Sequence, residues 1–86
     1  MNSNNIERAL DSVSRMIQAR AALQTILRGD YKNIVSAWIN AIKEAMRNTG
    51  KSPVEVLCML SEKETSGMIL LGLLAATLEI IEEEAR

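Results

Sequence analysis

The amino-acid sequence predicts an all-α protein, a small three- or four-helix bundle completed by self-association. Apolar residues make up 48% of the 86 residues, yet there is no Phe and aromatics account for only 2%. The core must therefore be aliphatic, and the scarcity of strand-type alternation favours helix throughout. A chain this short buries only about 60% of its unfolded surface, so a second subunit often completes such cores. Residues 1–86 are accordingly expected to form a single helical domain.

The first predicted helix covers about residues 5–28. Asn4 and Glu7 have the spacing of an N-cap with a reciprocal acid. Gly29 suits the left-handed conformation that follows a helix C-terminus, and Arg28 lies in the last turn, where the helix dipole favours a cation. The apolar residues expected to form one stripe are Ile6, Leu10, Val13, Ile17, Leu23, Ile26 and Leu27.

The second predicted helix runs from Tyr31 to about Asn48, with Asp30 as its cap and Gly50 as its stop. Its apolar side is expected to comprise Tyr31, Ile34, Val35, Trp38, Ile42, Ala45 and Met46.

The third predicted helix begins at the strongest local signal in the chain. Ser52 is a helix cap, Pro53 suits the first helical position, and Glu55 can return a hydrogen bond to the cap. The helix is expected to add Val54, Leu57, Cys58 and Leu60 to the core, which would make Cys58 a buried and inert thiol.

The fourth predicted helix, about residues 66–84, is apolar nearly all round and should lie at the centre of the bundle. Gly72 and Ala76 make one side smooth enough for a close helix crossing, either within the monomer or between two subunits. Because three short helices have limited area to cover it, part of this helix is assigned to self-association. The candidate residues are Met68, Leu71, Gly72, Ala75, Ala76 and Glu79.

Two polar residues interrupt apolar stripes. Arg20 either packs its stem while its head reaches water, or meets an acidic partner at an interface. Glu79 fits a narrow polar edge of the fourth helix, with an arginine of another subunit as the alternative partner. Residues 82–84 are all Glu at a helix C-terminus, where they oppose the dipole, so a frayed and solvated acidic tail is expected.

Charge is unevenly distributed along the chain. Residues 1–51 carry eight basic and four acidic side chains, whereas residues 52–86 carry two basic and seven acidic ones. The two parts either neutralise each other within the fold or offer partners two faces of opposite sign. The candidate partner contacts are Arg8, Arg15, Arg20, Lys32, Lys43 and Arg47.

Several classes of function lack the residues they need. Without histidine no serine or threonine has its usual base, and with a single cysteine neither a disulfide nor a Cys/His metal site is expected. No glycine loop for phosphate is present. A recognition helix would have to be residues 53–60 or the fourth predicted helix, and neither offers the polar residues that read bases. We therefore expect no enzyme activity, cofactor or metal site, and neither nucleic-acid binding nor membrane insertion, since the apolar stretch 68–81 is 14 residues long.

These observations predict a non-catalytic regulatory or inhibitor protein that binds an unidentified protein partner, of the kind that viruses and bacteria use as accessory regulators. The absence of a signal peptide pattern and the lone cysteine indicate the cytoplasm. One alternative is a protein that sequesters a small anionic ligand between subunits, lined by Arg20, Arg28 or Lys32. Another is a nucleic-acid-associated protein that uses the basic N-terminal half.

Overall fold

The computed structural model describes residues 3–63 and 66–86, and within these ranges it describes side chains from residue 11 onward. This part of the chain forms four α-helices and one short 3₁₀ segment, with no strand. The elements are α1 (Ser3–Leu27), η1 (Arg28–Asp30), α2 (Tyr31–Thr49), α3 (Pro53–Lys63) and α4 (Gly67–Ala85). The predicted all-α class is confirmed, while the side chains of the proposed first N-cap lie outside the described residues.

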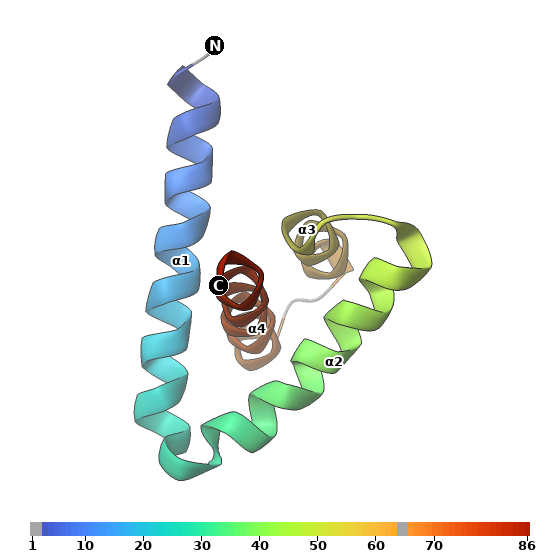
Figure 1. The fold of residues 1–86 in the computed structure, drawn as a ribbon. Coiled ribbons are helices and arrows are strands. Elements are labelled where there is room, and N and C mark those ends of the chain that lie inside the picture. The colour runs from blue at the N-terminus through green and yellow to red at the C-terminus, as the bar shows by residue number, and fades with distance from the viewer. Residues whose placement is uncertain (1–2, 64–65) are drawn as a thin grey trace.

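The helices surround α4. In Figure 1, α1 and α2 form a V that is closed at η1, and α4, seen nearly end on, lies between them with α3 beside it. α4 contacts each of the other three helices, whereas α1 packs chiefly on α4 and meets α2 only slightly. The V is thus held together through α4 and not by a direct packing of its two arms.

α4 is the centre of the core, as its all-round apolar pattern predicts. Its buried residues are Gly72, Leu73, Ala75, Ala76, Thr77, Leu78 and Ile80. Thr77 is the one buried polar residue in the described core, and its hydroxyl donates to the Leu73 carbonyl at 2.7 Å. The polar group is therefore satisfied within its own helix, at no cost in unpaired hydrogen bonds.

The smooth side of α4 is used within the chain. The Trp38 ring of α2 packs on Gly72 so closely that a Cβ there would lie 2.6 Å from ring carbons. Ala75 and Ala76 are fully buried. The sequence left open whether these small residues meet another helix of the same chain or a second subunit, and the structure places them in an internal crossing.

The predicted apolar stripe of α1 is confirmed in part: Leu23 is buried and Leu27 packs against the core, but other members of the stripe are exposed. Val13, Ile17 and Ile26 are 41%, 49% and 58% exposed, whereas Met16, Ala19 and Leu23 are almost completely buried. The apolar pattern of this helix is wider than the area that α4 can cover, so only one strip of it becomes core. Periodicity alone does not reveal which strip that is.

The orientation of α3 also differs from the prediction. Pro53, Val56 and Leu57 are buried, while Val54 is 38% exposed and Cys58 is exposed. A short helix with apolar residues on several sides turns toward its neighbours the side that fits them. The prediction of a core position is therefore confirmed for Leu57 and wrong for Val54 and Cys58.

The turn between α2 and α3 agrees with the sequence. Gly50 has φ +71°, in the left-handed region, and its N–H donates to the Met46 carbonyl at 2.8 Å. The Glu55 N–H donates to Ser52 Oγ at 3.3 Å, and the Ser52 N–H donates to Glu55 Oε1 at 3.1 Å. The reciprocal capping box is thereby confirmed.

The turn between α1 and α2 does not agree with it. Arg28 has φ +50° and is the only non-glycine residue with positive φ among those that the structure describes. Gly29 beside it is not left-handed. Asp30 makes no side-chain cap bond. The predicted roles of Gly29 as the left-handed stop and of Asp30 as a cap are both wrong, because the chain turns one residue earlier through η1.

Candidate functional site

A polar cluster joins α1, α2 and α4. Arg20 of α1 lies in the same strip as Met16 and Leu23, which places its guanidinium against α4. There Nη1 of Arg20 lies 2.5 Å from Glu82 Oε1 and 3.8 Å from Glu79 Oε1. The Tyr31 hydroxyl at the start of α2 donates to Glu79 Oε2 at 2.9 Å. Arg20 thus meets acids of its own chain, where the prediction placed solvent or another subunit.

The electrostatics of this cluster favour the charged forms of Arg20 and Glu82 and the neutral form of Tyr31. The hydrogen bond from Arg20 lowers the pKa of the Glu82 carboxyl, and the same bond raises the pKa of Arg20. Burial, followed by the hydrogen bond to Glu79, raises the pKa of Tyr31 well above its usual range. The phenol therefore stays protonated, which makes it a hydrogen-bond donor and not a nucleophile.

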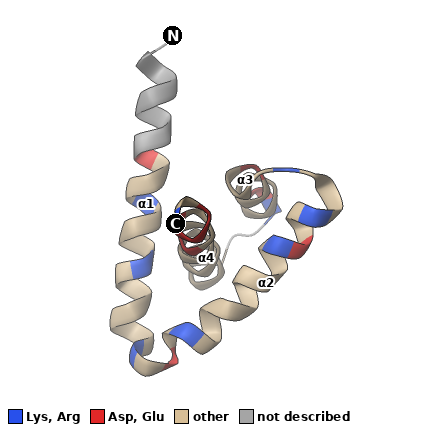
Figure 2. Cartoon of the chain, viewed as in Figure 1, with Lys and Arg blue, Asp and Glu red and all other residues tan. Residues whose placement is uncertain are grey.

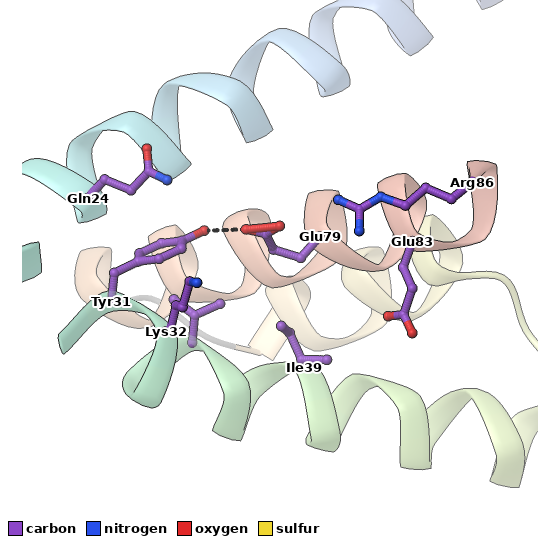
Figure 3. A pocket seen from close by; sticks show the side chains of 8 residues that line it. Gln24, Tyr31, Lys32, Ile39, Glu79, Glu83 and Arg86 are labelled. Carbon is purple, nitrogen blue, oxygen red and sulfur yellow. Dashed lines mark hydrogen bonds between the residues drawn. The ribbon is translucent and has the colours of Figure 1, made fainter. Parts of the chain in front are cut away.

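A cavity of about 500 Å³ lies beside the cluster. Figure 3 shows it between α1, α2 and α4, with Tyr31 reaching toward Glu79. Its lining residues are Gln24, Tyr31, Lys32, Val35, Ile39, Glu79, Glu83 and Arg86. Of the three residues predicted to hold an anion between subunits, Lys32 lines this cavity and Arg20 and Arg28 do not. Two carboxylates and two cations balance each other here, so the cavity offers an anion no excess of positive charge.

The acidic end of α4 is part of the packed structure. α4 remains helical to Ala85, Glu82 pairs with Arg20, and Glu83 Oε2 lies 3.1 Å from Lys43 Nζ. The expectation of a frayed, solvated tail is wrong, because basic side chains of α1 and α2 offset the unfavourable charge at this helix end. Both ion pairs join the basic part of the chain to the acidic part.

The residues assigned to self-association do not share one surface. Gly72, Ala75 and Ala76 are buried inside the chain, and Glu79 is half-buried in the polar cluster. Leu71 is half-buried, and Met68, 46% exposed, lies near the start of α4. The predicted set is therefore corrected: Gly72 packs on Trp38, Ala75 and Ala76 are buried within the chain, and none of the three forms an outer face.

The predicted basic contacts separate into paired and unpaired groups. Arg15 lies 3.2 Å from Asp11, while Arg20 and Lys43 hold acids of α4. Lys32 and Arg47 are exposed and make no ion pair with the described residues. The side chain of the remaining candidate, Arg8, lies outside the described residues.

Three basic residues lie together at the C-terminal end of α2 and on the turn that follows it. Lys43, Arg47 and Lys51 line a shallow hollow of about 380 Å³ together with Met46 and Gly50. Figure 2 shows basic residues along this end of α2 and on the turn that follows. We call Lys43, Arg47 and Lys51 the basic end of α2. Lys51 was not among the predicted contacts, because it belongs to a turn that the sequence indicates only as a helix stop.

Other kinds of site find little support in the described part of the chain. No group of three His, Cys, Asp or Glu residues there is placed to hold a metal ion. None of the described helices has the length and apolar character to span a bilayer. Cys58 lies on the wall of a groove between α1, α3 and α4, with Leu57, Leu70 and Leu74. The polar residues Ser12, Arg15 and Ser61 line the same groove.

Comparison of the chain with protein-family models, with curated proteins and with solved structures found no match. The functional argument therefore depends on the geometry of the molecule itself.

Proposed function

We propose that this protein is a non-catalytic regulator or inhibitor that binds an acidic surface of a partner protein through the basic end of α2. The observation that supports it is the state of Arg47 and Lys51. Both are exposed, and neither makes an ion pair with any described residue. Arg15, Arg20 and Lys43 are held by acids of this chain, whereas Arg47 and Lys51 are not, and these two line the same hollow.

The surroundings suit contact with a protein. Met46 is half-buried and contributes a flexible apolar side chain to the same hollow. Exposed charges at a contact speed the encounter between partners more than they strengthen the final complex. A partner with acidic residues around one apolar side chain would match this hollow in both charge and shape.

The test begins with partners recovered from native host extract and measured against the purified protein. The double variant Arg47→Glu/Lys51→Glu should slow association at least about tenfold at low salt and remove most of its salt dependence. The matched control is Lys32→Glu, an exposed lysine on the opposite end of α2. An unchanged association rate in the double variant would refute the proposal. Capture of nucleic acid in place of a protein would instead favour the nucleic-acid alternative.

We propose further that the protein self-associates in the cytoplasm. Ile17, Ile26 and Met68 are each exposed to nearly half or more, and contact with a second copy would remove such side chains from water. Light scattering at micromolar concentration should give a particle mass above the 9.5 kDa of one chain. A single-chain mass at all concentrations would exclude self-association and leave the proposal on the basic end of α2 standing.

A further inference from the structure

We propose that two copies of this chain exchange their α1 helices, so that α1 of each copy packs on α4 of the other. This inference rests on the proposed self-association and names its route. It follows from three features: the conformation of one residue in the turn, the packing of α1, and the ion pairs that hold α1 in place.

The turn between α1 and α2 contains a non-glycine residue with left-handed backbone angles. Leu27 and Asp30 have right-handed helical dihedral angles, as does Tyr31, and Arg28 alone of the residues described in this turn has positive φ. The left-handed region is unfavourable for a residue with a Cβ. If Arg28 adopted right-handed angles, α1, η1 and α2, of 25, 3 and 19 residues, would join into a rod roughly 70 Å long. Strained, short hinges of this kind favour exchange of the element they connect.

The packing of α1 survives such an exchange. α1 contacts mainly α4 and has little contact with α2, its neighbour along the chain. Its buried strip of Met16, Ala19 and Leu23 would find the same surface on the α4 of a second copy. No new complementarity is needed, because the partner surface is identical to the one already used.

The ion pairs identify the second copy as the occupant. Arg20 is half-buried and needs acids opposite it, which Glu82 and Glu79 provide at fixed positions on α4. An α4 from another copy supplies the same two carboxylates. The exposed Ile26 and Ile34, one on each side of the turn, lie where the two straightened rods would cross and would gain burial there.

The decisive experiment uses charge reversal in trans. Arg20→Glu and Glu82→Arg chains, one of them isotope-labelled, are unfolded together, refolded and weighed by native mass spectrometry. Either variant alone places like charges together, but an exchanged mixed dimer restores both attractive pairs. We expect mixed dimers to exceed the statistical proportion by about tenfold relative to the two homodimers.

The matched control is Lys43→Glu mixed with Glu83→Lys. This pair joins α2 to α4, which stay in one chain during the exchange, so mixing should give no preference for mixed dimers. Dimers of statistical composition in the Arg20 and Glu82 mixture would overturn the exchange while leaving self-association intact, and monomers alone would overturn both.

A second variant tests the hinge without disturbing the ion pairs. Arg28→Gly accepts positive φ freely and should lower the dimer fraction severalfold at a given concentration. A dimer fraction equal to that of the wild type would contradict the exchange.

Discussion

The two turns that flank α2 are built in opposite ways. At the α2–α3 turn, glycine occupies the left-handed position and Ser52 and Glu55 cap the next helix. At the α1–α2 turn, an arginine is left-handed and no side chain caps the helix that follows. The first turn is stabilised by its own residues. The second persists because Arg20 and Tyr31, on either side of it, are both anchored to α4.

The two turns differ in how far they depend on the rest of the fold. A turn with matching local chemistry is nearly independent of the rest of the fold, whereas a turn without it depends on contacts distant in sequence. Substitutions in the core should therefore affect the placement of α1 more than that of α3.

The first prediction concerns the packing that holds α1. Leu23→Ala should lower the free energy of unfolding by about 2–5 kcal/mol, because Leu23 is fully buried and its truncation leaves a cavity. Ile26→Ala, on the 58% exposed side of the same helix, should change it by less than about 1 kcal/mol. Urea unfolding followed by circular dichroism measures both. Similar losses for the two variants would refute the observed orientation of α1.

The second prediction concerns the crossing of α2 and α4. Gly72→Ala should destabilise the protein by about 1–3 kcal/mol, since the new Cβ would lie 2.6 Å from the Trp38 ring. The fluorescence of Trp38, the only tryptophan in the chain, should shift as the ring is displaced. Gly29→Ala is the control, because nothing lies within 4 Å of a Cβ at that position. A neutral Gly72→Ala variant with unchanged fluorescence would contradict the close crossing.

The third prediction compares the two left-handed residues directly. Gly50→Ala should cost about 1–2 kcal/mol, because alanine is disfavoured at positive φ. Arg28→Gly should have the opposite effect and stabilise the single chain by about 0.5 kcal/mol. This is the net gain that remains after the greater conformational entropy of glycine in the unfolded chain is subtracted. Thermal unfolding at low concentration, where one chain predominates, gives both signs. A loss in both variants would show that the two turns are alike.

The fourth prediction concerns the capping box. Ser52→Ala should reduce stability by about 1 kcal/mol through loss of the hydrogen bond from the Glu55 N–H. Binding of the folded variant to its partner should be unchanged. Ser36→Ala, on exposed α2 surface, is a suitable control. Loss of binding with normal stability would instead make the turn a contact site.

The smallest effect expected is the pH dependence. Hydrogen bonds hold the pKa of Glu55 and of Glu82 below the usual glutamate range. A carboxyl with a lowered pKa in the folded state stabilises the protein above its unfolded pKa, and this contribution is lost as pH falls through the folded pKa. The free energy of unfolding, measured with urea, should therefore decrease as the pH is lowered below the ordinary pKa range of glutamate. The decline should be shallower in Glu55→Gln and in Glu82→Gln, and an equally steep decline in both variants would contradict the prediction.

Much of the helical architecture follows from the sequence alone. The helix bounds near Tyr31, Gly50 and Pro53 were predicted, as were the capping box and the central position of α4. These features depend on interactions between residues close in the chain, or on a helix so apolar that only the interior suits it. The opposite charges of the two parts of the chain left open whether they neutralise each other or face partners, and the pairs of Arg20 and Lys43 with α4 show neutralisation in part.

Tertiary packing determines which side of each helix faces inward and which charges remain unpaired. Val13 and Met16 have equally suitable side chains for the core, as do Val54 and Val56, and the choice depends on the area that α4 can cover. The same contact uses Arg20 and Lys43 but leaves Arg47 and Lys51 exposed. Arg28 takes the left-handed conformation beside an available glycine because the anchored ends of α1 and α2 dictate where the chain must turn, and these distant contacts outweigh a local preference worth about 1 kcal/mol.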